Sequence, residues 1–141
     1  MKSRRRNRIE IINVLYSCEL LSDYDLKRIY ETNDFLDADQ YKQIERIILN
    51  AAYLTKIVSR FLESKTWEQE NPLVRAILLN ATYEFFFLEP KIVINEAVEI
   101  TKDFFGNSNE SNMYKHVNKV VDNVYRFFVL NEAIVRKYFV K

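Results

Sequence analysis

The sequence predicts an all-α protein of 141 residues that forms one domain. Only one Gly and two Pro are present, which is too few for the tight turns that β-hairpins and β-sandwiches need. Apolar residues make up 48% of the chain, enough for a sizeable core, and they recur at helical spacing. The ten Phe, nine Tyr and one Trp exclude disorder of the whole chain.

The first predicted helix covers residues 9–21, where apolar side chains form a stripe with helical period. A basic segment precedes it, so that the rest of the chain carries a net charge of −4 although the total is +1. Cations at a helix N-terminus oppose the helix dipole. We therefore expect a first turn that is frayed in the free protein and becomes ordered when an anionic ligand binds. The cations of the basic segment are Lys2, Arg4, Arg5, Arg6 and Arg8.

Two further helices are expected before the middle of the chain. Ser22 has the character of a weak N-cap and opens a short helix near residues 23–31. After a linker over 32–38, apolar side chains recur at helical spacing through a long helix at about 39–64. The pattern breaks over 65–71, and we place a boundary between two subdomains there.

The N-terminal subdomain then covers about residues 1–66 and the C-terminal subdomain about 67–141. At the start of the second subdomain, Asn71 and Pro72 are typical of the cap and the first residue of a helix. The helix predicted there, over about 72–88, is apolar nearly all round. Such a helix either lies in the centre of the core or is partly covered by a partner protein.

Two more helices complete the prediction. One covers about residues 92–105 and stops at Gly106, the sole glycine, which is best explained as a left-handed C-terminal cap. A polar loop over 107–112 follows. The last helix is expected to start near Met113, to break near Asn131 and to resume as far as Phe139.

The residue types predict neither an enzyme nor a metal or cofactor site. Cys18 lies among apolar helix positions and is typical of a small core residue, while His116 fits a surface or half-buried imidazole. Nothing in the sequence links the two as a nucleophile and its base, and together they cannot form a usual zinc site. The longest uncharged run, residues 47–55, is too short to span a bilayer. We expect a cytoplasmic protein with no disulfide and no membrane attachment.

Four segments, in order along nearly the whole chain, form a recognisable pattern. They are Arg4-Arg5-Arg6-x-Arg8 with Leu15-Tyr16-Ser17, then Leu78, Ala81 and Tyr83-Glu84, then Val93-Ile94-Asn95-Glu96-Ala97-Val98-Glu99-Ile100, and finally Val117-Asn118-x-Val120-x-Asp122. The pattern resembles the NusB family of transcription antitermination factors, and the Asn-Glu-Ala-Val-Glu segment is its most specific part. Two positions differ, since His116 stands where the family commonly has Phe and Lys119 where it has Gly.

The resemblance implies a fold, an activity and partners. The fold would be the all-α NusB fold, two packed three-helix subdomains, here with a basic N-terminal arm. The activity would be binding of boxA-type single-stranded RNA in rRNA leaders, which suppresses termination. The protein partner would be the S10-type ribosomal chain, called NusE in this role, and the complex would join RNA polymerase with the other Nus factors. No cofactor is implied.

The basic segment is the predicted RNA-binding site. Guanidinium groups pair with phosphates in a bidentate manner, which explains the preference for Arg. Tyr16 is a candidate for stacking on a base, but core packing explains it better. Lys119 is a candidate for a second phosphate contact, and a solvated helix face explains it equally well. The predicted RNA-binding residues are Lys2, Arg4, Arg5, Arg6, Arg8, Tyr16 and Lys119.

The predicted docking surface for the protein partner lies in the C-terminal subdomain. The three consecutive Phe residues over 85–87 point in directions about 100° apart on a helix, so one core-facing side cannot hide them all. Either neighbouring helices enclose them or they form an interface. The residues predicted for this interface are Glu84, Phe86, Phe87, Glu96 and Glu99; the alternative is that the acids are solvated and the Phe side chains internal.

A second function remains open from the sequence. The chain would then be a non-enzymatic helical scaffold that binds proteins without specific RNA recognition, and the basic segment would only keep it in solution. Retention on short single-stranded RNA at low salt distinguishes the two functions. The sequence leaves open the RNA sequence and whether the free protein is a monomer or a homodimer.

Overall fold

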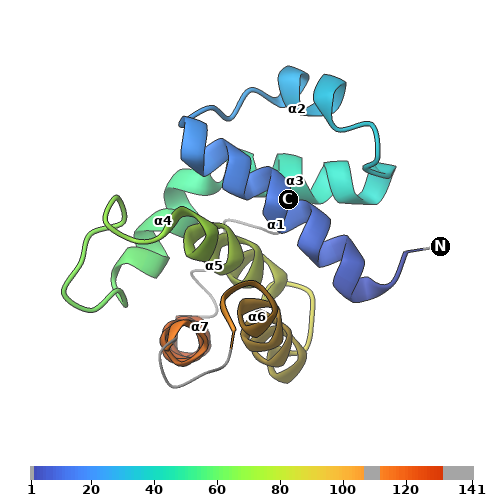
Figure 1. Cartoon of the computed structure of the whole chain (residues 1–141). Coiled ribbons are helices and arrows are strands. Elements are labelled where there is room, and N and C mark those ends of the chain that lie inside the picture. Colours follow the sequence, from blue (N-terminus) through green and yellow to red (C-terminus); the bar gives the residue numbers. More distant parts are fainter. Residues whose placement is uncertain (1, 107–111, 132–141) are drawn as a thin grey trace.

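The computed structural model describes residues 2–106 and 112–131, and all regular secondary structure in these residues is helical, which confirms the predicted fold class (Figure 1). No helix in this described part is long and apolar enough to cross a membrane. The helices are α1 (Arg4–Leu21), α2 (Leu26–Thr32), α3 (Ala38–Leu49), α4 (Ala51–Ser59), α5 (Pro72–Glu84), α6 (Pro90–Phe105) and α7 (Met113–Leu130).

The start of α1 corrects the expectation of a frayed first turn. Ser3 is the N-cap, and its Oγ accepts a hydrogen bond of 3.1 Å from the backbone N–H of Arg6. The basic residues from Arg4 onward are therefore helical. The repulsion from the helix dipole is offset because several of these cations pair with carboxylates, as described below.

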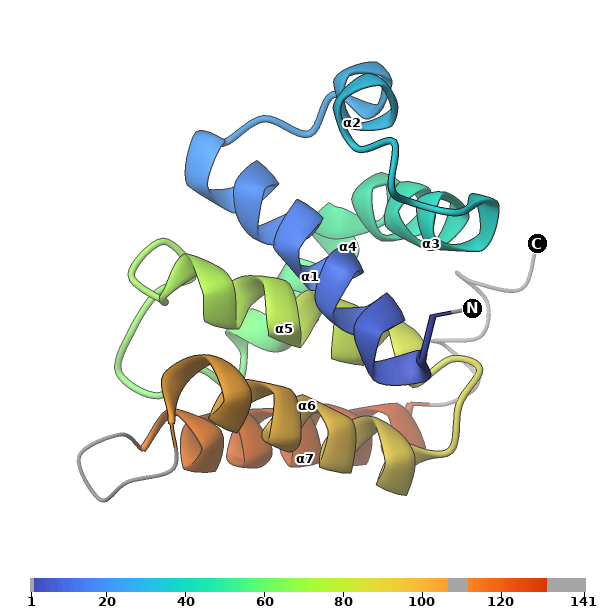
Figure 2. The same ribbon diagram turned by 45° about the vertical axis from the view of Figure 1, so that its right-hand side comes forward.

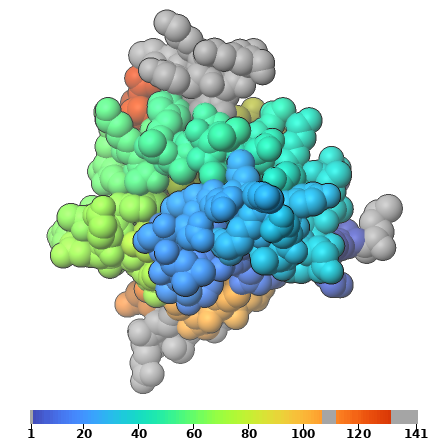
Figure 3. All heavy atoms as spheres, turned by 90° about the horizontal axis from the view of Figure 1, so that it is seen from above, coloured from blue at the N-terminus to red at the C-terminus, as the bar shows by residue number. Residues whose placement is uncertain are grey.

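The segment between α1 and α5 differs from the prediction at Ser22, at Asn50 and at the end of α4, which is Ser59 and not residue 64. Ser22 has a φ of 50° and ends α1, whereas Asp25 caps α2 by accepting hydrogen bonds from the backbone N–H groups of Lys27 and Arg28. The predicted long helix over 39–64 is two helices, α3 and α4, because the backbone leaves the helical conformation at Asn50, with φ of −110° and ψ of 13°. Seen from above, the segment that contains α2 fills the centre of this face, with α3 beside it (Figure 3).

Helix α5 lies at the centre of the fold, with α1 on one side and the pair α6–α7 on the other (Figure 2). Its N-terminus is as predicted, since the Oδ1 of Asn71 accepts a hydrogen bond of 2.8 Å from the backbone N–H of Leu73. The helix ends at Glu84, earlier than expected, and residues 85–88 form a turn. Every residue of α5 from Val74 to Glu84 is buried, so the helix belongs to the core.

Helices α6 and α7 pack against each other below α5. Gly106 ends α6 with a positive φ of 85°, as a glycine cap should, but its ψ of 171° is not that of the left-handed helical region. Helix α7 ends at Leu130 with Asn131 as its C-cap, close to the break expected near Asn131. Most of the polar loop, residues 107–111, and the predicted continuation to Phe139 lie outside the described residues.

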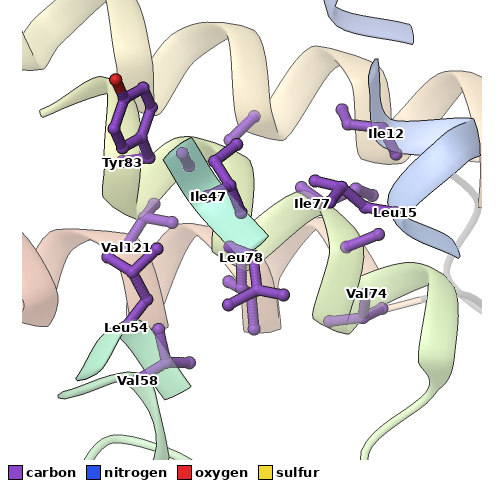
Figure 4. Close-up of a cluster of buried hydrophobic side chains, with 14 of the residues drawn as sticks. Ile12, Leu15, Ile47, Leu54, Val58, Val74, Ile77, Leu78, Tyr83 and Val121 are labelled. Atoms are coloured by element: carbon purple, nitrogen blue, oxygen red, sulfur yellow. The ribbon is translucent and has the colours of Figure 1, made fainter. Parts of the chain in front are cut away.

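One hydrophobic core runs through the described part of the chain (Figure 4). It joins Leu15 of α1, Leu54 of α4, Leu78 of α5 and Val121 of α7. Cys18 is buried in this core, as predicted for a small apolar side chain. Helix α5 contacts α1 and α4 as well as α6 and α7, so one core spans the predicted boundary near residues 65–71. The division into two subdomains stays a prediction.

Candidate nucleic-acid interface

Two arginines of the basic segment pair with carboxylates of α5 and α6. Arg8 is buried, and its Nε lies 3.0 Å and 3.1 Å from the two carboxylate oxygens of Glu84 on α5. Arg5 makes a bidentate pair with Glu96 on α6, at 3.1 Å from Nε to Oε1 and 2.6 Å from Nη2 to Oε2. The Nη1 of Arg8 also lies 3.4 Å from Glu96. These pairs fix the first turns of α1 on α5 and α6.

The two carboxylates of this cluster respond differently to their surroundings. Burial raises the pKa of Glu84 above its ordinary value, although the charge and hydrogen bonds of Arg8 act in the opposite direction. The hydrogen bond from Arg5 lowers the pKa of Glu96, which is closer to the surface. Removal of Arg8 would leave the buried carboxylate of Glu84 without its partner, so Arg8 has a structural task, and Arg5 ties α1 to α6 through the half-buried Glu96.

Arg4 and Arg6 of the basic segment are exposed, whereas Lys2 is largely covered and its ammonium group is bonded to Glu10, to Gln40 and to the backbone oxygen of Phe35. The side chain of Arg6 is 68% exposed, and its Nε lies 3.2 Å from Glu10 one turn along α1. Lys2 also pairs with Glu10, at 2.7 Å, and its hydrogen bond is the main reason that the pKa of Glu10 falls to about 2. The Arg4 side chain is exposed and has no ion pair or hydrogen bond with any described residue. Arg4 and Arg6 are thus the arginines of this segment whose side chains are most open to a ligand.

A groove of about 820 Å³ lies beside the start of α1. Arg4 and Arg8 line it on the α1 side, Lys91 and Asn95 on α6, and Asn118 on α7. The apolar part of its wall comes from Ile92, Ile94 and Val98 of α6. The groove has the mixture of cationic, amide and apolar groups that a nucleotide chain can contact.

The last two predicted RNA-binding residues, Tyr16 and Lys119, do not line this groove. Tyr16 is half-buried and packs against the core, as its alternative explanation required. Lys119 is 61% exposed on α7, and its ammonium pairs with Glu63 in the loop between α4 and α5. Their contacts with RNA remain predictions.

The predicted docking residues are spread over different environments. Glu84 is buried and paired with Arg8, which corrects the expectation that its carboxylate lies on the surface. Phe87 is 55% exposed, whereas Phe86 is half-buried with its ring centroid 4.9 Å from that of Phe128. Glu96 pairs with Arg5, and Glu99 is half-exposed, with Lys102 at 3.7 Å. Phe87 and Glu99 therefore offer the most accessible surface of the five.

Sequence reasoning did not find Lys91, Asn95 or Asn118 as groove residues. Asn95 and Asn118 belong to the segments that resemble a known family, but nothing in the segments themselves shows that they line a groove with Arg4. Lys91 lies in the first turn of α6, which begins at Pro90 and not at about residue 92 as predicted, and a lysine there has no local partner to mark it. Only the packing of α1 on α6 brings these side chains together.

The fold and the groove define an all-α protein with a cationic helix terminus beside a polar groove. Residues 5–126 match the NusB family, and the chain belongs to this family. It is 31% identical over 135 residues to the transcription antitermination protein NusB of Buchnera aphidicola subsp. Cinara cedri, covering 88% of this chain and 92% of that protein. The corresponding protein of Cupriavidus pinatubonensis is 35% identical over 133 residues, covering 86% of this chain and 75% of its own length.

A solved structure agrees with these sequence matches. The structure of T. maritima NusB superimposes with a TM-score of 0.71 at 28% sequence identity, covering 89% of this chain and 92% of that one. The all-α NusB fold is therefore the fold of this protein. The names of the sequence relatives describe transcription antitermination and no catalytic activity.

Proposed function

We propose that this protein is a non-enzymatic, RNA-binding transcription antitermination factor. It binds boxA-type single-stranded RNA of rRNA leaders together with the S10-type ribosomal protein, NusE. The complex acts on RNA polymerase with the other Nus factors and suppresses termination. Membership of the NusB family and the names of the relatives support this function.

The observation that carries the RNA-binding part of the proposal is the arrangement of α1. Arg4 and Arg6 are exposed in its first turn, while Arg5 and Arg8 anchor the same turn to α5 and α6. A ligand therefore meets guanidinium groups that a fixed helix presents, which lowers the ordering cost of binding. Guanidinium groups at this position suit phosphate oxygens, whereas a phosphate contact from Lys2 would have to replace its bonds to Glu10 and Gln40.

The protein partner would dock in the C-terminal half of the chain. The exposed ring of Phe87 and the carboxylate of Glu99 offer an apolar anchor and a negative charge to a basic ribosomal protein. The partner would add cations beside the RNA and increase the affinity of the complex. We expect a one-to-one complex that binds RNA more tightly than either protein alone.

The test is a titration of labelled boxA-like single-stranded RNA with the protein, with and without the S10-type chain. In the variant with Arg4→Ala and Arg6→Ala, two phosphate contacts are lost, so the log–log salt slope should flatten by about 1.4 in total. The matched control is the pair Lys42→Ala and Lys56→Ala, two exposed lysines on α3 and α4. Unchanged RNA affinity in the arginine variant would reject this site, and binding of the ribosomal chain without any RNA binding would favour the scaffold function.

A further inference from the structure

The groove beside α1 contains a cation that lies outside the basic segment. Lys91 is exposed in the first turn of α6, and it lines the same groove as Arg4 of α1. Neither side chain has an ion pair or a hydrogen bond within residues 2–106 and 112–131. The start of α1 lies over α6 (Figure 2), so two separate elements contribute a cation to one groove.

The other charges of the groove cancel one another. Glu96 is the one acid among the described residues that line it, and it is already paired with Arg5 and Arg8. Arg8 is in turn paired with Glu84. The charges of Arg4 and Lys91 are left over, so the groove has a surplus of positive charge. Both belong to the first turns of their helices, where the helix dipole also favours an anion.

The neutral groups of the groove are also available to a ligand. The side-chain amides of Asn95 and Asn118 are exposed, and no described residue forms a hydrogen bond with them. An amide both donates and accepts, so it can contact a ribose hydroxyl or a base edge. The apolar side chains of Ile92 and Val98 supply a surface on which a base can lie.

We infer that Lys91 binds an RNA phosphate together with Arg4, and that the RNA runs through this groove from the start of α1 across α6 to Asn118 of α7. The volume of about 820 Å³ falls within the range of roughly 300–1,000 Å³ that is usual for small-ligand sites, so it suits a short stretch of nucleotides. This inference rests on the proposed RNA binding and adds a second element to the site.

The experiment measures the affinity for short single-stranded RNA by fluorescence anisotropy at several salt concentrations. Lys91→Ala should flatten the log–log salt slope by about 0.7, which corresponds to about a fivefold loss of affinity at 0.1 M salt. Lys91→Arg should restore the slope, because it restores the charge. Lys42→Ala is the control, since Lys42 is an exposed lysine on α3 that does not line the groove.

A second variant separates charge from hydrogen bonding. Asn95→Leu should weaken RNA binding at every salt concentration without a change of slope, because a neutral amide releases no counterions. Far-ultraviolet circular dichroism of each variant checks that the helices remain, as expected for exposed positions.

The outcomes for the two proposals differ. If the Arg4 and Arg6 variant loses affinity while Lys91→Ala and Asn95→Leu behave as wild type, the RNA passes elsewhere and the inference is overturned, although the RNA-binding function stands. If the wild-type protein binds no RNA, the proposed function fails first. If Lys91→Ala weakens binding of the S10-type chain without RNA and leaves RNA affinity unchanged, the groove receives a protein, and the inference is again overturned.

Discussion

The Nε2 atom of His116 lies 2.5 Å from the Oε1 atom of Glu70 and so joins α7 to the loop that precedes α5. The Glu70 side chain is completely buried, while that of His116 is 22% exposed. The other carboxylate oxygen of Glu70 lies 3.4 Å from the Nζ of Lys65 and accepts a hydrogen bond of 2.9 Å from the backbone N–H of Asn71. His116 is thus half-buried, as its residue type and position predicted.

Stability should fall in acid because of Glu70. Burial by itself would raise its pKa, but the hydrogen bond and charge of His116, with Asn71 and Lys65, bring the folded-state pKa below the ordinary value of 4.5. The carboxylate therefore stabilises the native state above the ordinary pKa, and this contribution is lost as the pH falls through the lower folded-state value. Urea unfolding between pH 3 and about pH 7 should show a smaller decline for Glu70→Gln than for the wild type. An equal decline in both proteins would contradict this role.

His116→Phe should lower the free energy of unfolding at neutral pH by about 1–3 kcal/mol, because it leaves a buried carboxylate oxygen without its donor. Adding Glu70→Gln should recover part of this loss, since the neutral amide is less costly to bury. Urea unfolding of the two single variants and the double variant gives the coupling energy between the positions. Strictly additive effects would show that the contact contributes nothing.

The arginines of the basic segment should separate into two groups by stability. Arg8→Met removes the partner of buried Glu84 and should destabilise the fold by about 3–5 kcal/mol, whereas the double change with Glu84→Leu should be far milder. Arg6→Ala changes an exposed position and should alter stability by less than about 0.5 kcal/mol. Thermal and urea unfolding measure both effects. Equal stability of the Arg8→Met and Arg6→Ala variants would contradict the pairing.

Ser3 should affect RNA binding without touching RNA. Ser3→Ala removes the N-cap of α1 and should cost about 0.5–2 kcal/mol of helix stability, concentrated in the first turn. Hydrogen exchange at Arg6 and its neighbours should become faster, and RNA affinity should fall because Arg4 and Arg6 lose their fixed positions. Ser3→Thr keeps the capping hydroxyl and should behave as wild type. Exchange rates that are the same in all three proteins would show that the cap is unimportant.

Cys18 should be inert in the native protein. Burial raises the pKa of its thiol to about 11, so very little thiolate is present at neutral pH. Alkylation by iodoacetamide at pH 7.5 should be slow in the folded protein and fast in urea, as mass spectrometry can follow. Fast labelling of the native protein would contradict the burial.

The parts of the fold that depend on local chemistry were predictable. The scarcity of Gly and Pro gave the helical class, and Asn71 with Pro72 marked the start of α5 because caps act within one turn. The break at Asn50 was missed, since the apolar spacing continues through it from α3 into α4. The spacing of apolar residues cannot show where one helix ends and the next begins when the buried positions keep the same period across the break.

For the candidate site, the sequence predicted that cations are present but not which of them are free to bind a ligand. The sequence showed a run of arginines, but it could not show that Arg8 is neutralised by Glu84, because 76 residues separate the two. For the same reason, Lys91 had no signal that placed it beside Arg4. Local spacing identifies residue types that can bind a phosphate, whereas tertiary packing decides which of them are free to do so.

The pairing of Arg5 with Glu96 has a consequence during synthesis of the protein on the ribosome. The arginines leave the exit tunnel before α6 does, because the carboxylate that positions Arg5 is made 91 residues later. A contact of such long sequence separation carries a loop-closure cost and cannot form before both residues have left the ribosome. A nascent chain that ends before α6 therefore carries the basic segment without the scaffold that orients it, and its contacts with anions should be weak and non-selective. Selective RNA binding should arise only after α6 has joined the core.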